Sequence, residues 1–265
     1  MAGFALAGGS LGGASLEFLF TLIGSLSLYG MGMVFNDLAG QEEDLAHGHS
    51  HKPLISGEVQ AKEAFLLGIG LFLLGNWALL SGGFPILFGG ILSFAILAYD
   101  FGAAGRLKPV FFWHGAAPLL LGLCRSLNLG LGFFLLKPQL TGWPLPLIFL
   151  GSYGLYTLLV GVHGRFEDLG AQIPSKISRS LAGLALLLLV LPPLLLPLPW
   201  VGVFLLPSLF FALKQSDIHA RTGILLKGFS RFGFMLALGS KAFAIASLCA
   251  FPAWILPFFV GKRWT

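Results

Sequence analysis

The chain has 265 residues, of which 56% are hydrophobic and only 10% are charged, and its mean hydropathy is +0.88. A soluble domain carries roughly 25% charged residues, so this composition leaves no room for a separate soluble domain and predicts one all-α membrane domain over residues 1–265. The net charge of +5 does not indicate a nucleic-acid partner, because the basic residues are scattered over predicted loops and form no stripe interleaved with aromatic residues.

Apolar stretches along the chain predict a polytopic transmembrane helical bundle of about eight to nine spans. The stretch 2–13 is apolar but shorter than the roughly 20 residues that cross a bilayer, so we expect the first span to be truncated. Eight further spans are expected at residues 16–35, 64–80, 85–101, 109–131, 143–162, 180–196, 200–213 and 232–260.

The connections between these spans alternate in charge. Two short ones are uncharged, whereas most basic residues lie in the longer segments 36–63, 101–108, 163–179 and 214–231. Alternating spans place those four segments on one side, and the positive-inside rule assigns that side to the cytoplasm. We therefore expect an integral protein of a prokaryotic cell inner membrane, with these loops facing the cytoplasm.

The acidic residues follow the same asymmetry, and only Glu17 lies away from the charged face. The positive-inside rule says little about acidic residues. A polyanion bound through divalent metal ions is one cause that would gather carboxylates at one membrane face.

The first candidate site directly follows an apolar span, where residues 36–44 read NDLAGQEED. If the helix continues, Asp37 and Asp44 lie seven residues apart, about two turns, and share one face. Asn36 adds an amide oxygen, and oxygen ligands of this kind suit Mg²⁺ when substrate phosphates complete its coordination. A solvated acidic helix end explains the same spacing, so both interpretations stay open.

The second candidate site, RFED at residues 165–168, also stands at the charged end of a predicted span. Its carboxylates belong to Glu167 and Asp168. Alone this pair is a weak signal, but two carboxylate clusters on one predicted face strengthen the metal hypothesis.

The arrangement of the first cluster resembles the UbiA superfamily of intramembrane prenyltransferases. Those proteins carry an N-D-x-x-D-x-x-x-D loop after their second helix, followed by a basic-Pro-Leu/Ile-x-Ser-Gly stretch. This chain has Asn36, Asp37 and Asp44 at the first, second and last positions of the loop, and KPLISG follows at residues 52–57.

Later segments extend the resemblance over essentially the whole chain. Tyr99 and Lys108 resemble a tyrosine and a lysine that flank the loop after the fourth helix, and Glu167-Asp168 falls where the second aspartate-rich motif belongs. Residues 124–130, CRSLNLG, also resemble an EboC-type branch of UbiA-like proteins, which is associated with moving a metabolite precursor across a membrane.

The resemblance implies a Mg²⁺-dependent transferase that moves an isoprenyl group from an isoprenyl diphosphate to a small, typically aromatic, acceptor. Metal ions held by the two motifs would help the diphosphate to leave, and the acceptor would attack the allylic cation in a water-poor cavity. On this resemblance the metal-binding residues are Asn36, Asp37, Asp44, Glu167 and Asp168, of which Asp37, Asp44 and Asp168 are the catalytic candidates. It also implies that Asp37 and Asp168 serve one diphosphate.

Arg125 lies in the middle of a predicted span, where a charge costs about 2.5–3.5 kcal/mol on insertion scales and usually faces a cavity or a partner. Asn128 is one turn away and should share its face. Two interpretations remain: Arg125 points into a central cavity, or it forms a structural pair with Glu17 or a backbone carbonyl. The substrate-contact candidates are Asn36, Tyr99, Lys108, Arg125 and Asn128.

Two departures from the family pattern support a competing hypothesis. Gly40 replaces the middle aspartate of the first motif, and the second motif has Ala171 or Gln172 where another aspartate is usual. Fewer carboxylates should bind metal more weakly. The alternative is therefore a catalytically degenerate UbiA-like membrane protein that takes part in export or transport of a metabolite precursor.

Overall fold

The computed structural model describes residues 16–46, 48, 52–104, 116–135, 144–168, 175–196, 198–239 and 245. Within these residues every regular element is a helix, which confirms the all-α prediction. The described residues up to Cys124 form one compact unit, here the N-terminal unit, and those from Arg125 onward form the C-terminal unit. The boundary lies inside α7 (Ala116–Phe134). The single domain expected over residues 1–265 stays a prediction.

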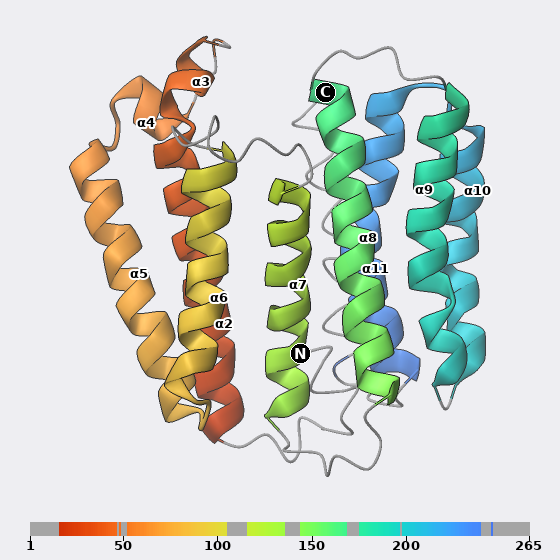
Figure 1. Cartoon of the computed structure of the whole chain (residues 1–265), viewed down its shortest axis with the longest axis horizontal. Helices are drawn as coiled ribbons and strands as arrows, with labels where there is room; N and C mark the ends of the chain where they lie inside the picture. Colours follow the sequence, from red (N-terminus) through yellow and green to blue (C-terminus); the bar gives the residue numbers. More distant parts are fainter. Residues whose placement is uncertain are drawn as a thin grey trace. The chain divides into compact units, whose positions relative to one another are not determined.

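The N-terminal unit is built on a close pair of long helices, α2 and α5, which lie side by side in Figure 1. Small residues permit this approach, because a Cβ added at Gly24 would come within 2.7 Å of Leu79, and one at Gly75 within 2.7 Å of Leu28. Helices in lipid associate largely through such close packing. The elements of this unit are α2 (Leu16–Ala39), α3 (Gln41–Ala46), α4 (Pro53–Ser56), α5 (Ala61–Ser81), α6 (Ile86–Leu97) and the π-helical η2 (Ala98–Ala104).

Local signals set the ends of these elements. Proline at its first position starts α4, and Gly57, with a φ of 79°, ends it in the left-handed region that favours glycine. A reciprocal capping box between Gln60 and Glu63 starts α5. These short-range signals fix both ends of α4 and the start of α5.

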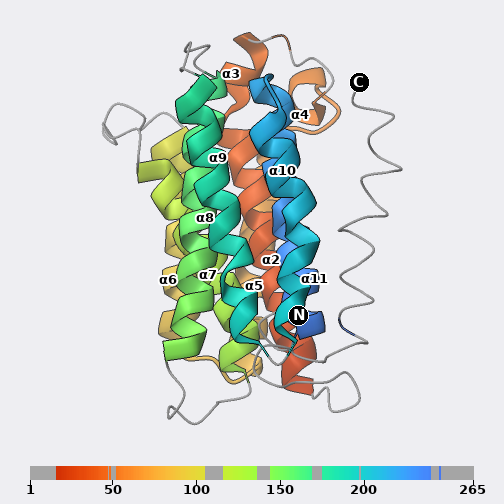
Figure 2. The ribbon, with the colours of Figure 1, turned by 90° about the vertical axis from the view of Figure 1, so that its right-hand side faces the viewer.

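The C-terminal unit is a bundle in which α8, α9 and α10 run side by side, with α11 packed against them (Figure 2). Its core contains fully buried Tyr156, Leu186, Leu189 and Met235. Prolines replace α-helix by short 3₁₀ turns between α9 and α10. The elements are α8 (Pro144–Asp168), α9 (Ser175–Val190), η4 (Pro192–Leu195), η5 (Pro199–Leu205), α10 (Leu206–Lys214) and α11 (Ile218–Gly239).

Five of the described helices are long and apolar enough to cross a membrane: Leu16–Ala39, Ala61–Ser81, Ala116–Phe134, Leu147–Gly164 and Lys176–Leu195. The segments Ile86–Gly102 and Trp200–Lys214 are shorter apolar helices. Large apolar side chains such as Leu66, Leu73 and Phe94 are exposed, as expected for helices that face lipid. The protein is therefore an integral membrane protein, and the count of eight to nine spans stays a prediction. The stretch 2–13 lies outside the described residues.

One boundary prediction was wrong. Residues 214–231 were expected to form a charged connection before a span at 232–260, but α11 already begins at Ile218. Asp217 caps this helix, since its carboxylate accepts hydrogen bonds from the backbone N–H groups of His219 (3.4 Å) and Ala220 (2.9 Å). These hydrogen bonds hold the pKa of the Asp217 carboxyl below its usual value.

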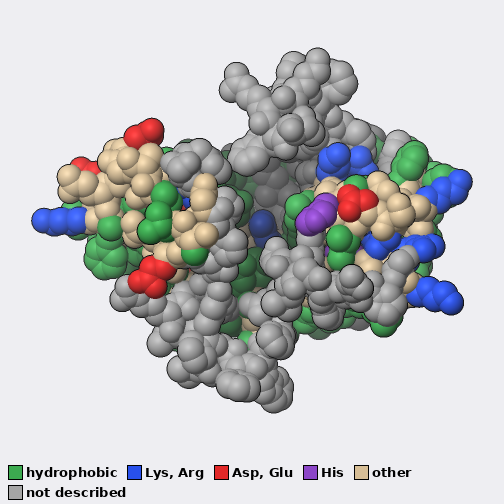
Figure 3. All heavy atoms as spheres, turned by 90° about the horizontal axis from the view of Figure 1, so that it is seen from above, with side chains coloured by type: hydrophobic (Ala, Val, Ile, Leu, Met, Phe, Trp, Pro, Cys, Tyr) green, Lys and Arg blue, Asp and Glu red, His purple; other side chains and the backbone are tan. Residues whose placement is uncertain are grey.

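The two units differ in the charge of the side chains that Figure 3 shows on each of them. Acidic side chains are prominent on the N-terminal unit, and lysine and arginine side chains gather on the C-terminal unit. Exposed Lys176 and Arg179 at the start of α9, and Lys214 at the end of α10, contribute to the second group.

Candidate functional site

The first acidic motif spans the end of α2 and the whole of α3. Asn36 and Asp37 occupy the last turn of α2, Gly40 forms a turn, and Asp44 lies in α3. Helix-like hydrogen bonds continue through the turn, because Gly40 N donates to Asn36 O and Asp44 N donates to Gly40 O, both at 2.9 Å. The helical path is thus nearly continuous, and the two aspartates face the same side.

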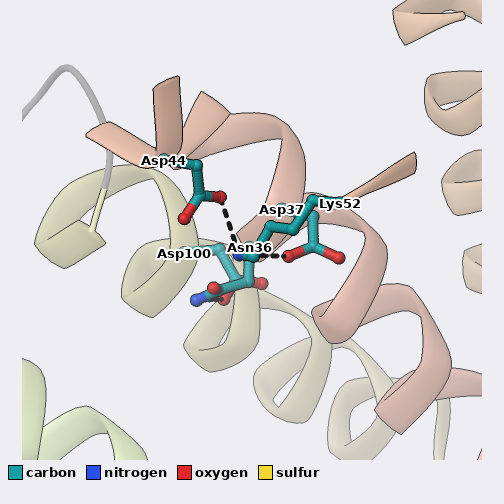
Figure 4. A network of polar contacts seen from close by, with 5 residues as sticks. All are labelled: Asn36, Asp37, Asp44, Lys52 and Asp100. Carbon is teal, nitrogen blue, oxygen red and sulfur yellow. Dashed lines mark hydrogen bonds and ion pairs between the residues drawn. The ribbon is translucent and has the colours of Figure 1, made fainter. Parts of the chain in front are cut away.

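Lys52 brings these two carboxylates together (Figure 4). Its Nζ donates to Asp37 Oδ1 at 3.2 Å and to Asp44 Oδ2 at 2.7 Å. Partial burial lowers the pKa of Lys52, but the hydrogen bonds with Asp44 and Asp37 and their charges outweigh it, so the net pKa lies above the usual 10.5. The side chain is therefore an ammonium ion, and the loop contains one position to which both carboxylates point.

This geometry fits a single divalent cation at the position that the ammonium now holds. Magnesium typically takes one or two protein carboxylates and completes its shell with water and substrate phosphates. Among the described residues no group of three or more His, Cys, Asp or Glu gathers to form a fuller protein cage. Gly40 is one reason why the protein ligands are few. A Cβ at this position would lie 3.8 Å from Asp44 Oδ2, but glycine has no side chain and therefore no carboxylate to add.

Asp100 joins the same network and was not selected from the sequence. It lies in η2, is only 2% exposed, and its Oδ1 accepts a long hydrogen bond of 3.4 Å from Asn36 Nδ2 (Figure 4). Its Oδ2 is buried without a hydrogen-bond partner among the described residues. The contact turns the amide nitrogen of Asn36 towards Asp100 and leaves the amide oxygen on the other side. In the sequence, the signal for Asp100 was that of a single carboxylate at the end of an apolar stretch.

An apolar pocket of about 250 Å³ opens beside the two aspartates. Asp37, Asp44, Lys52 and Glu63 are the charged part of its lining, and the rest is apolar. The aliphatic lining comes from α2, from α4 with the turn after it, and from α5, and includes Val34, Leu54, Ile55, Val59 and Leu67. The N-terminal unit therefore places charged side chains next to a pocket that is lined mainly by hydrocarbon.

The second acidic motif, Glu167 and Asp168, forms the last turn of α8. The side chains of both residues lie outside the described part of the structure, so their role as metal ligands stays a prediction. The alternative positions Ala171 and Gln172 also lie outside the described residues.

A buried polar network anchors the same end of α8. His163 Nε2 lies 2.7 Å from Ser178 Oγ on α9, and its Nδ1 lies 3.1 Å from Thr222 Oγ1 on α11. Arg221, only 1% exposed, donates to Ser178 Oγ and to backbone carbonyls at the end of α10. The network joins four helices one turn before the second motif.

The remaining predicted substrate contacts are described only in part. Arg125 and Asn128 are half-buried on α7, and the Arg125 guanidinium lies 5.4 Å from the ring centroid of Phe229, a cation–π contact. Tyr99 is half-buried in η2, beside Asp100. Lys108 lies outside the described residues. Within the described residues, no contact assigns any of these side chains to a substrate.

Comparison with known proteins adds one finding. The model of the UbiA prenyltransferase family matches residues 1–223, most of the chain. No curated protein and no solved structure matches the chain.

Proposed function

Since the chain belongs to the UbiA prenyltransferase family, we propose that it transfers an isoprenyl group from an isoprenyl diphosphate to a small aromatic acceptor, with Mg²⁺ assistance. Membership in the family and the apolar helices place prenyl-transfer chemistry in a membrane. The acceptor class and the Mg²⁺ dependence are the steps that the proposal adds.

The observation that carries the proposal is the convergence of Asp37 Oδ1 and Asp44 Oδ2 on one cation, the Lys52 ammonium. A diphosphate carries several negative charges and cannot lie beside bare carboxylates without a mediating cation. Asp37 and Asp44 would bind Mg²⁺ together with the amide oxygen of Asn36, and Lys52, released from the carboxylates, would donate to a phosphate oxygen.

The bound ion would neutralise charge on the departing diphosphate. The apolar pocket beside the carboxylates would take the first carbons of the prenyl chain and keep water from the reacting carbon. Glu167 and Asp168 are proposed as further metal ligands, and Tyr99, Lys108, Arg125 and Asn128 as substrate contacts, on the resemblance alone. We also propose that the motif loops face the cytoplasm of a prokaryotic cell.

Calorimetry with a non-hydrolysable isoprenyl diphosphate analogue, in detergent and at several Mg²⁺ concentrations, tests the proposal. Wild type should bind the analogue only with Mg²⁺, and Asp37→Asn or Asp44→Asn should weaken that binding by about ten- to a hundredfold. Glu58→Gln, an exposed acid outside the pocket, is the matched control and should bind as wild type does. Binding that is equal with and without Mg²⁺, or absent altogether, contradicts a metal-dependent transferase.

The Lys52 contacts also favour a second candidate, the UbiA-like membrane protein without transferase activity. The Lys52 ammonium already neutralises the carboxylates, so the loop can keep its structure without metal. Gly40 also replaces an aspartate that would be a further metal ligand. This candidate predicts no transfer from a labelled prenyl diphosphate to any acceptor in a panel. Transport of a precursor by reconstituted vesicles would then be the activity to measure.

A further inference from the structure

Another pocket lies in the C-terminal unit, between α10 and α11, and belongs to neither acidic motif. It has a volume of about 390 Å³. Its cations are Lys214 at the end of α10 and Lys227 and Arg231 on α11, and none of its lining residues is acidic. Ser208 is also in the lining, and Phe211 and Ile224 contribute apolar surface. We call these residues the basic pocket.

Two of the cations lie well along α11, which is not among the candidate membrane spans of the described residues. At 1.5 Å per residue, Lys227 and Arg231 are about 14 and 20 Å from the first residue of α11. That helix packs against α8 and α9, which contain candidate spans. Lys227 is exposed and Arg231 is half-buried, and both line the pocket. Their shared pocket, which has no acidic lining residue, suits an anionic ligand.

Contacts within the unit hold two of these side chains at the pocket. Arg231 Nη1 donates to Ser208 Oγ, which ties the guanidinium of α11 to α10. The Lys214 Nζ lies 4.3 Å from the ring centroid of Phe210, so its alkyl chain rests on the helix that carries it. A planar guanidinium with an adjacent ammonium is an arrangement that suits phosphate oxygens.

From this charge and this lining we infer that the basic pocket binds the phosphate headgroup of an anionic phospholipid. The three cations would contact the phosphate, and Phe211 and Ile224 would contact the glycerol and the start of an acyl chain. Basic pockets between transmembrane helices are typical headgroup sites. An isoprenyl diphosphate shares the chemistry of phosphate on an apolar tail, but the proposed donor site uses carboxylates and Mg²⁺, whereas this pocket has no carboxylate and needs no metal.

Native mass spectrometry of the full chain in detergent with EDTA tests the inference. Phosphatidylglycerol should remain bound in preference to phosphatidylcholine. A Lys214→Gln, Lys227→Gln variant should bind phosphatidylglycerol about thirtyfold more weakly, about fivefold for each lysine lost. The Lys214→Arg, Lys227→Arg variant keeps both charges and should bind as wild type does. Lys176→Gln, which removes an exposed cation at the same end of the unit, is the control outside the pocket.

Two outcomes would overturn the inference. Equal retention of both phospholipids, or equal loss in the glutamine and arginine variants, would show that the charge does not select a headgroup. Displacement of phosphatidylglycerol by farnesyl diphosphate at equal concentration in EDTA would assign the pocket to the prenyl donor instead. Because these measurements need neither Mg²⁺ nor an acceptor, their failure is separate from failure of the proposed transferase, and an Asp37→Asn variant should retain the lipid.

Discussion

At the residue scale, Lys52 occupies the position at which we propose that a metal ion binds the acidic loop. Its side chain is 34% exposed and pairs with Asp37 and Asp44, which are 51% and 14% exposed. Exposed pairs of this kind are worth about 0.2–1 kcal/mol each. Because a metal ion at this position would have to displace the ammonium, we expect Lys52 to weaken metal binding in the absence of substrate and to strengthen diphosphate binding once it is released.

The variant Lys52→Met separates these two effects. We expect Mg²⁺ to bind the ligand-free protein about two- to thirtyfold more tightly, and the diphosphate analogue to bind more weakly, in calorimetry. Lys62→Met, an exposed lysine at the start of α5, is the control. The raised pKa means that the Lys52 contribution is complete below pH 10.5 and is lost only as the pH rises through the higher folded-state value, so the difference should not change between pH 6 and 9. Unchanged Mg²⁺ affinity in Lys52→Met would show that the ammonium does not hold the metal position.

The contact between Asn36 and Asp100 predicts that the amide and the carboxylate can be exchanged between the two positions. Asn36→Asp alone would place two carboxylates at a buried hydrogen-bonding distance, and we expect it to lower the free energy of unfolding by about 1–3 kcal/mol. Adding Asp100→Asn restores a donor and an acceptor, with their positions exchanged, and should recover most of that loss. The exchanged protein should bind Mg²⁺ at least as well as wild type, because a carboxylate oxygen replaces the amide oxygen.

Unfolding in mixed micelles and Mg²⁺ calorimetry measure the exchange. Asp100→Asn alone is the intermediate control, since an amide at position 100 can still accept from Asn36 but no longer fixes its orientation. If the double variant is as unstable as the sum of the single variants, the two side chains do not depend on each other.

At the element scale, the network of His163, Ser178 and Arg221 fixes the end of α8 that bears the second acidic motif. Ser178→Ala would leave a buried histidine nitrogen and a buried guanidinium each short of one partner. We expect a loss of about 1–3 kcal/mol in unfolding free energy. Ser180→Ala, an exposed serine on the same helix, should change it by less than about 0.5 kcal/mol. Equal effects of the two substitutions would contradict a structural role for the network.

The helices were predictable from the sequence wherever an apolar run ended at a turn or cap. The spans expected at 16–35 and 64–80 correspond to α2 and α5, each of which extends a few residues further. The start of α11 was missed because the charges of Arg221, Lys227 and Arg231 lower the local hydropathy to a level that is typical of a loop. In the folded chain Arg221 and Arg231 donate to oxygens on neighbouring helices, and no single-sequence pattern reveals such partners.

The candidate site was predictable only for residues whose spacing along the sequence places them on one face of a helix. Asp37 and Asp44 could be placed on one face because seven residues make about two helical turns. Their pairing with Lys52 joins residues 15 and 8 positions apart, and the contact between Asn36 and Asp100 joins residues 64 positions apart. Contacts of that kind come from helix packing, which the spacing of motif residues does not encode.

At the scale of the whole molecule, the sidedness of the membrane arrangement is open to a direct test. The distribution of lysine and arginine predicts that the α4 region and the α10–α11 turn face the same compartment. Single cysteines at exposed Ser56 and Ser216, in a background with Cys124 and Cys249 replaced by alanine, should both react with a membrane-impermeant maleimide from the cytoplasmic side. Reaction from opposite sides would show that the predicted number of intervening spans is wrong.

Cooperation between the two motifs is also a property of the whole chain, and the family resemblance predicts it. If Asp37 and Asp168 serve one substrate, residues acting as a unit should be non-additive. The variant Asp37→Asn, Asp168→Asn should then lose little more Mg²⁺-dependent analogue binding than the worse single variant. Additive losses in calorimetry would instead indicate that each motif acts by itself.

The π-helical stretch Ala98–Ala104 makes the N-terminal unit sensitive to chain length. A π-helix closes its hydrogen bonds over one more residue than an α-helix, so it accommodates an extra residue within a helix. Deleting Ala98 would let the α6 helix continue regularly and would rotate Asp100 by about 100° away from Asn36. A substitution such as Ala98→Ser preserves the residue count and therefore the direction of Asp100. Among natural variants of this chain, single-residue insertions and deletions in this stretch should consequently be rarer than substitutions.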